Sequence, residues 1–159
     1  GLKKPQEGRR CNMEQAKIQH LEMIQSVINR LASNSFAYKA WMVGIVSALL
    51  ALGISMQSII IFGLSLIPLV AFWFLDSYYL HKERMYRILY EDIRTMSDAN
   101  WRENAFDMDC SKVIVRSKGF LNAVFSITEI ALYGSLIVVV LLLLIFVCTG
   151  LACNSAISF

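Results

Sequence analysis

Long stretches of the chain contain no charged side chain. Residues 40–75 read AWMVGIVSALLALGISMQSIIIFGLSLIPLVAFWFL, and residues 130–159 are equally free of charge. A helix of a soluble core carries polar residues on one face, whereas a run that is apolar on every face for about 18 residues or more is typical of a membrane span. The pattern therefore predicts membrane-spanning helices. A buried hairpin of a soluble domain is the alternative, and the second charge-free stretch disfavours it.

The first stretch is too long for one crossing and suits two, because a span needs about 20 residues. Its most polar and most helix-breaking point is residues 53–58, which we expect to form the turn. We predict span one at residues 36–54, span two at 58–79 and span three at 128–147.

The residues from Met13 onward follow the pattern of an amphipathic helix. One apolar stripe recurs at helical spacing and is our candidate partner face: Ile18, Leu21, Ile24, Ile28 and Leu31. Gln and Asn are prominent on the opposite face, so we favour packing against another helix over binding to the membrane surface, where a Lys/Arg-rich face is usual. Residues 33–35 (Ser-Asn-Ser) are expected to interrupt this helix and to cap span one.

Span two is predicted to continue beyond the apolar stretch as one helix to about residue 96, because HKERMYRILYEDIRTM contains neither Gly nor Pro. Pro68 lies inside span two, where membrane helices tolerate a kink. A polar segment follows, and residues 111–129 are then expected to form a basic, amphipathic approach to span three.

The basic residues indicate the orientation. All 15 of them lie either at or before Lys39 or between Lys82 and Lys118. Because positive charge near span ends stays on the cytoplasmic side, we predict a cytoplasmic N-terminus and an outside C-terminus. These residues alternate with 12 acidic ones and form no dense patch, so we expect no nucleic-acid partner.

The predicted fold class is an all-α membrane protein with three transmembrane helices and a cytoplasmic helical module. The charged fraction of 17% fits this class, since soluble domains average about 25%. The expected parts are 1–12, an upstream extension or cloning remnant ahead of a start at Met13; 13–34, the cytoplasmic amphipathic helix; 36–79, the transmembrane hairpin; 80–118, the cytoplasmic extension and loop; 119–150, the third span; and 151–159, the outer tail.

Three ionisable residues stand at the predicted cytoplasmic edge of the spans. Lys39 and Asp76 reach a similar depth on neighbouring helices, and Glu129 begins span three. An unpaired charge at this depth is costly, so we expect Lys39 and Asp76 to form an ion pair that Glu129 can join. Fixing the register of the helices is the favoured role, and a gating or ion-path role is the alternative.

Small residues on the first two spans are candidates for close helix packing: Gly44, Ala48, Ala51 and Gly63. Such residues let membrane helices approach closely, so we expect a tight hairpin and a looser third helix.

Residues suited to catalysis are few. His20 and His81 belong to no ligand pair, and Asp107-Met108-Asp109-Cys110 lacks a spaced partner set for a metal. We therefore expect solvated surface at these positions, no cofactor, no metal and no enzyme. Cys11 and Cys110 are expected to be free thiols, while Cys148 and Cys153 are weak candidates for oxidation between subunits.

Three segments carry a resemblance: QHLEMIQSVINRLASNSFAYKAW, FWFLDSYYLHKERMYRILYEDI and AFDMD. They resemble a family of small bacterial membrane proteins without an assigned activity, over about residues 13–145. The general plan is also distantly similar to the SLATT-type membrane effectors found beside bacterial anti-phage systems. That second resemblance implies self-association and damage to the membrane, by analogy of architecture alone.

The leading hypothesis is therefore a homo-oligomeric protein of the bacterial inner membrane that permeabilises it under control of its cytoplasmic helices. Its partners would be the lipid bilayer and further copies of itself. The alternative is a non-conducting anchor or adaptor that holds a cytoplasmic protein partner. A membrane-embedded enzyme is the third and least favoured reading.

Overall fold

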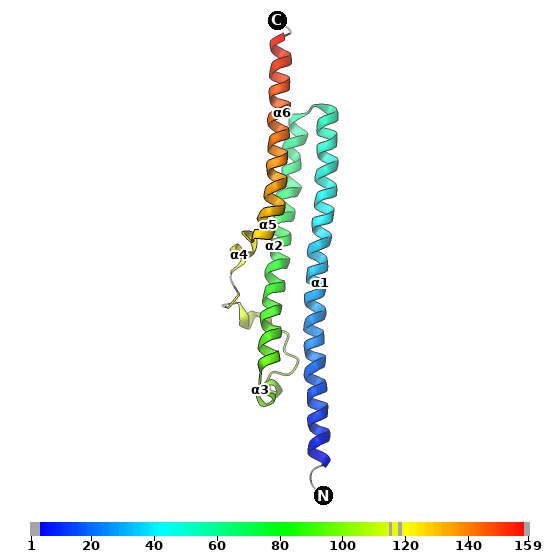
Figure 1. Cartoon of the computed structure of the whole chain (residues 1–159), viewed down its shortest axis with the longest axis vertical. Helices are drawn as coiled ribbons and strands as arrows, with labels where there is room; N and C mark the ends of the chain where they lie inside the picture. The colour runs from blue at the N-terminus through cyan, green and yellow to red at the C-terminus, as the bar shows by residue number, and fades with distance from the viewer. Residues whose placement is uncertain (1–3, 115, 118, 158–159) are drawn as a thin grey trace. The chain divides into compact units, whose positions relative to one another are not determined.

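The computed structural model describes the backbone of residues 4–114, 116–117 and 119–157, and the side chains between residues 12 and 150 except at 115 and 118. Within these ranges all regular structure is helical and no strand occurs. The elements in chain order are α1 (Lys4–Met56), α2 (Ile59–Thr95), α3 (Asp98–Glu103), the 3₁₀ turn η1 (Cys110–Val113), α4 (Phe120–Val124), α5 (Ile127–Glu129), the π-helical turn η2 (Ile130–Gly134) and α6 (Ser135–Ile157) (Figure 1).

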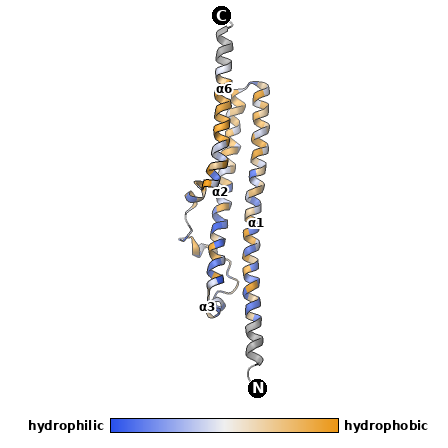
Figure 2. Cartoon of the chain, viewed as in Figure 1, coloured by the Kyte–Doolittle hydropathy of each residue, from blue (hydrophilic) through white to orange (hydrophobic). Residues whose placement is uncertain are grey.

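Among the residues that the structure describes, three helical segments are long and apolar enough to cross a membrane: Asn12–Met56, Ile59–Thr95 and Ile127–Gly150. Hydrophobic residues gather along the parts of α1 and α2 that flank their connecting turn, and along the described part of α6 up to Gly150 (Figure 2). The prediction of an all-helical chain with three such helices is confirmed.

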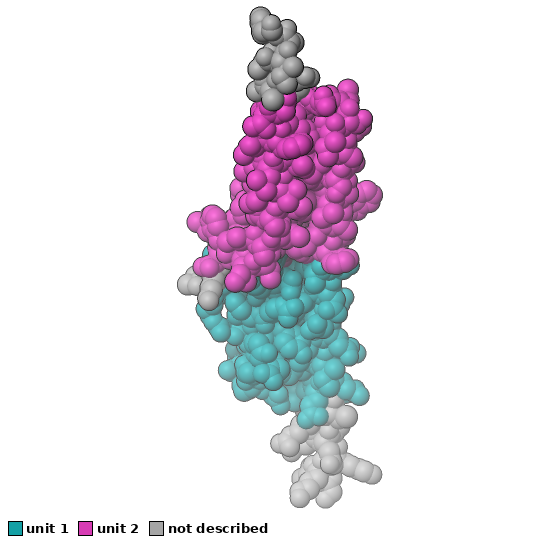
Figure 3. Space-filling model, turned by 45° about the horizontal axis from the view of Figure 1, so that its top comes forward, with its two compact units in different colours: residues 1–33, 80–119 teal, residues 34–79, 120–159 magenta. Residues whose placement is uncertain are grey.

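The chain divides into two compact units (Figure 3). Unit 1 comprises Gly1–Ser33 and Leu80–Gly119, and unit 2 comprises Asn34–Tyr79 and Phe120–Phe159. Both long helices, α1 and α2, contribute a segment to each unit.

Unit 1 has a small hydrophobic core between the first part of α1 and the last part of α2. Ile24 and Ile28 pack with Leu89, Ile93 and Trp101. Polar contacts hold the flanking segments: Lys17 Nζ donates to the Met96 carbonyl at 2.7 Å, and Arg116 pairs with Asp92 at 2.7 Å. The apolar stripe of α1 therefore supplies one side of the hydrophobic core of this unit.

Unit 2 brings the second part of α1, the first part of α2 and the C-terminal helix together. Its buried core is Met42, Val46, Leu69, Tyr133 and Val140. The Trp73 ring stacks on Tyr133 with a centroid distance of 6.1 Å, and its Nε1 donates to the Val124 carbonyl at 3.2 Å. The indole thereby fixes both the short helix α4 and the start of the last long helix.

The predicted helix break at residues 33–35 is wrong, because α1 runs without interruption from Lys4 to Met56. The Ser35 hydroxyl does not cap a helix; it bonds to Asp76 on α2 instead. The expected start of the helix at Met13 is also too late. A long helix tolerates single Ser and Asn residues, since each costs only a fraction of a kcal/mol relative to Ala.

The predicted turn at residues 53–58 is tighter in the structure, where only Gln57 and Ser58 separate the two helices. Gln57 adopts a φ of 47°, and the Ser58 amide donates to the Gly53 carbonyl at 3.2 Å. The predicted continuation of span two is confirmed: α2 ends at Thr95 and keeps Pro68 inside it.

Candidate functional site

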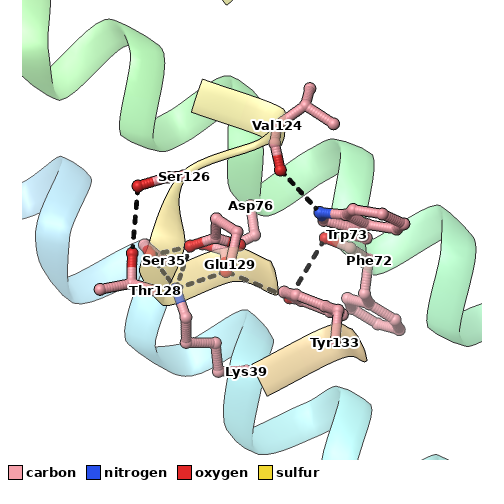
Figure 4. Close-up of polar contacts among 10 residues, drawn as sticks. All are labelled: Ser35, Lys39, Phe72, Trp73, Asp76, Val124, Ser126, Thr128, Glu129 and Tyr133. Atoms are coloured by element: carbon pink, nitrogen blue, oxygen red, sulfur yellow. Dashed lines mark hydrogen bonds and ion pairs between the residues drawn. The ribbon is translucent and has the colours of Figure 1, made fainter. Parts of the chain in front are cut away.

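Three charged residues that the sequence singled out meet inside unit 2 (Figure 4). Lys39 comes from α1, Asp76 from α2 and Glu129 from the end of α5. The Lys39 ammonium group forms an ion pair with Asp76 Oδ2 and lies 3.2 Å from Glu129 Oε1. The ammonium group thereby connects the three long helical segments of this unit.

Both carboxylates are removed from solvent. Asp76 is 0% exposed and Glu129 is 1% exposed, whereas the Lys39 side chain keeps 27% of its surface accessible. Burying a charge is costly unless partners replace the lost hydration, so the polar atoms around each carboxylate decide how well it is compensated.

Asp76 is well compensated, because three donors surround it. The Ser35 hydroxyl donates to Oδ1, while Lys39 and the Tyr133 hydroxyl, at 3.1 Å, contact Oδ2. Ser35 in turn accepts a hydrogen bond from Lys39 Nζ at 3.0 Å. The lysine therefore uses its three donors on Ser35, Asp76 and Glu129.

Glu129 is compensated only in part. Its Oε1 accepts from Lys39, but its Oε2 is buried and has no hydrogen-bond partner among the residues that the structure describes. One ammonium group faces two carboxylates, so with all three groups ionised the trio carries one excess negative charge. Glu129 therefore differs from Asp76 in that its negative charge is less well compensated.

Sequence reasoning missed Ser35 and Tyr133. Ser35 lies one helical turn before Lys39, which places both side chains on the same face of α1. Tyr133 lies four residues after Glu129, inside the π-helical turn η2. A hydroxyl within an apolar run was the available signal for Tyr133, since buried phenols normally bond to a partner.

A second polar cluster lies in unit 1 and is centred on His20. The ring is 0% exposed and contacts the rings of Trp101 and Phe106. Trp101 Nε1 lies 3.2 Å from His20 Nδ1, and His20 Nε2 lies 3.2 Å from the Asp107 carbonyl oxygen. Since an indole nitrogen only donates, Nδ1 must accept, and the neutral ring carries its proton on Nε2.

The expectation that His20 belongs to a solvated surface is therefore wrong. The residue lies beside the core residues Ile24 and Trp101, and the loop after α3 covers it. Phe106 in that loop has a φ of 60°, an unusual conformation for a residue with a side chain. This conformation places the Phe106 ring against the His20 ring, with 5.5 Å between the ring centroids.

The acidic loop at residues 107–112 is held by its own hydrogen bonds. The Lys112 side chain, and then the Asp109 amide, lower the pKa of Asp107 below its usual range. The hydroxyl and the amide of Ser111 do the same for the pKa of Asp109. In the part of the chain that the structure describes, no three His, Cys, Asp or Glu residues gather as a metal site.

The small residues do not pack the hairpin as predicted. Gly44, Ala48, Ala51 and Gly63 are all exposed, and a Cβ added at Gly44 or Gly63 would meet no atom within 4 Å. The inward face of α1 is formed by Met42, Val46 and Gly53 instead. Gly53 is the glycine at a close approach, because a Cβ there would lie 3.1 Å from the Phe62 ring.

The candidate partner face is largely used inside the chain. Ile24 and Ile28 are buried, Leu21 and Leu31 are half-buried, and Ile18 remains 53% exposed. The stripe therefore packs on α2 of the same unit, and only Ile18 is a fully open position.

The cysteines whose side chains are described, Cys110 and Cys148, are free thiols, and Cys148 is exposed. The side chains of Cys11 and Cys153 lie outside the described residues, as does the predicted outer tail from residue 151.

Comparisons with protein-family models, with curated proteins and with solved structures found no match. Over its described residues the chain is all-helical, and three of these helices are long and apolar enough to cross a membrane. The resemblance to small bacterial membrane proteins stays a prediction.

Proposed function

We propose that the chain is an integral protein of the bacterial inner membrane that self-associates and permeabilises the membrane, controlled through unit 1. In this proposal α1, α2 and the helix from Ile127 onward span the bilayer, with the N-terminus in the cytoplasm. The three apolar helices and the one-sided distribution of basic residues support it.

A groove on the outer side of α1 is the observation that carries self-association. It has a volume of about 380 Å³ and is lined by Ala40, Trp41, Gly44, Ile45 and Ala48. Small residues spaced four apart let a second helix approach the backbone closely. Gly44 and Ala48, which do not pack the hairpin, therefore suit contact between copies.

Several copies are needed for a conducting path. Residues 136–147 of α6 are all apolar, so this helix offers no polar group over most of its length. An aqueous or gated path then has to form between subunits, where a hydrophobic constriction can open and close.

The test is native mass spectrometry of the full chain in nanodiscs, followed by dye release from liposomes. We expect a defined oligomer of several copies, and a Gly44→Leu variant that is mostly monomeric and releases at least about tenfold less dye, since filling the groove costs more than about 1.4 kcal/mol of association. Gly63→Leu is the matched control, because Gly63 is also exposed but lies outside the groove. A wild-type monomer that leaves liposomes intact would contradict the proposal.

A non-conducting adaptor is the second candidate, and a groove in unit 1 favours it. The groove has a volume of about 540 Å³, and its lining includes the exposed side chains of Met23 and Phe106. Met and aromatic residues are common in surfaces that bind proteins. A monomeric chain that retains a stoichiometric soluble protein, and loses it in Met23→Asp, would support the adaptor over the effector.

A further inference from the structure

The charge network of unit 2 contains one negative charge too many. The Lys39 ammonium group contacts both Asp76 and Glu129, and among the described residues no other cationic group lies within salt-bridge distance of either carboxylate. Asp76 also receives the Ser35 and Tyr133 hydroxyl groups. The excess charge is therefore concentrated on Glu129.

The geometry of Glu129 shows which oxygen of the network is left without a partner. Its side chain is 2% exposed, one carboxylate oxygen contacts Lys39, and the other, Oε2, is buried with no hydrogen-bond partner among the described residues. A buried carboxylate oxygen that accepts no hydrogen bond carries a desolvation cost that no partner offsets.

We propose that Glu129 is a proton-binding site, and that a proton on Oε2 completes the charge balance of the network. A proton from water adds to the carboxylate and forms one O–H bond, so the trio changes from one excess negative charge to neutrality. No other bond is made or broken. The inference does not depend on self-association or on permeabilisation.

The contacts around Glu129 change when a proton binds to it. The groups that face it are Lys39 from α1, Asp76 from α2 and the Tyr133 hydroxyl, which bonds to Asp76. When Glu129 is neutral, Lys39 is held chiefly by Asp76; when Glu129 is charged, Lys39 is shared between the two carboxylates. Proton binding thus alters how strongly the last helix is tied to α1.

The lysine beside the site is partly accessible. Lys39 retains 27% of its side-chain surface in contact with solvent, while its ammonium group lies 3.2 Å from Glu129 Oε1. The buried carboxylate therefore borders a side chain that reaches solvent.

Infrared difference spectroscopy of the full chain in nanodiscs tests the site. Between about pH 8 and about pH 6, exposed glutamates with a usual pKa of about 4.3 stay ionised, so a new carboxylic-acid carbonyl band reports a buried group. We expect this band on acidification in the wild type and its loss in Glu129→Gln. Glu91→Gln, an exposed residue paired with Arg94, is the matched control and should keep the band.

A labelled wild-type protein covers the case in which the Gln variant does not fold. Incorporation of carboxyl-¹³C glutamate should shift the band, whereas labelled aspartate should leave it in place and thereby exclude Asp76. No band in the wild type, or a band that persists in Glu129→Gln or ignores labelled glutamate, would overturn the proposal.

Salt substitution separates a proton from a metal cation at the same oxygen. The midpoint of the band should be the same in sodium chloride and in choline chloride of equal concentration. A midpoint that moves to lower pH only with sodium would mean that Na⁺ competes with the proton at the carboxylate, and the claim that a proton alone completes the charge balance would be rejected.

Discussion

The two buried polar clusters of this protein solve the same problem with different means. In unit 1, the neutral His20 ring has one donor and one acceptor nitrogen, and each has one complementary partner. In unit 2, one lysine faces two carboxylates, and one carboxylate oxygen has no partner. Burial is equally complete in both, since His20 and Asp76 are 0% exposed and Glu129 is 1% exposed.

The difference indicates different roles. A neutral cluster in which every donor meets an acceptor rigidifies a core and has nothing to exchange with solvent. A charged cluster in which one oxygen has no partner is stabilised when a proton or a cation binds to that oxygen. We therefore infer that the His20 cluster positions the loop after α3. The network around Glu129 is the one that we propose to exchange a proton with water.

The largest effect should come from reversing a charge in unit 2. Asp76→Lys places a second ammonium group beside Lys39, and breaking a buried pair costs about 3–5 kcal/mol, so we expect little folded protein by size-exclusion chromatography in detergent. The double variant with Lys39→Asp should recover part of the yield, because the opposite charges are restored. Glu91→Lys is the control at an exposed position and should fold normally. Absence of any rescue would contradict the direct contact.

A smaller effect is expected from the neutral cluster of unit 1. Trp101→Phe removes the donor to His20 Nδ1 and leaves a buried acceptor unsatisfied, which costs about 1–3 kcal/mol of unfolding free energy. Thermal unfolding measures the loss. Phe36→Leu serves as the control because Phe36 is 75% exposed, and its unfolding temperature should be unchanged. Equal losses in the two variants would show that the indole N–H is not the cause.

The comparison can be refined through the loop that supplies the second partner of His20. The pKa of Asp107 is lowered in the folded state, so its carboxylate stabilises the fold above its usual pKa of 3.8 and this contribution is lost as the pH falls through the lower folded value. We expect a small drop in unfolding temperature below about pH 4. Asp107→Asn should abolish that part of the pH dependence, while the exposed Glu103→Gln should not. A wild type whose stability is flat in this range would refute the assignment.

Charge was the feature that sequence reasoning could use. Lys39, Asp76 and Glu129 interrupt or border apolar runs, and an isolated charge there demands a partner, so their meeting could be expected. The unbroken course of α2 could also be expected, since no Gly or Pro interrupts it after Pro68. In both cases the signal lies in a short stretch of sequence. An unpaired charge in an apolar run is energetically costly, and a stretch without Gly or Pro has no residue that breaks a helix.

The burial of His20 could not be read from the chain in the same way. Its partners, Trp101 and Asp107, follow it by 81 and 87 residues. A neutral histidine among Gln and Glu residues carries no local sign that a distant loop will cover it. The π-helical turn η2 was equally hidden, because its widened backbone depends on how the last helix meets the rest of unit 2.

The small residues show a third reason for failure. A helix face is decided by rotation about its axis, and Met42 and Val46 rather than Gly44 and Ala48 turn towards the core of unit 2. The composition of α1 would allow either of these two faces to turn towards the core. The choice is made by the fit of whole side chains such as Phe62 and Leu69, which no spacing rule contains.

The separation of the network along the chain has a consequence for biogenesis. Lys39 and Glu129 are 90 residues apart, and Asp76 is synthesised between them. In the proposed membrane topology, a hairpin inserted during translation would enter the bilayer with one lysine and one aspartate. Glu129 is synthesised after both, so the excess negative charge of the network appears only once α5 has been made. A chain stopped before α5 would therefore contain the Lys39–Asp76 pair without the carboxylate that unbalances it.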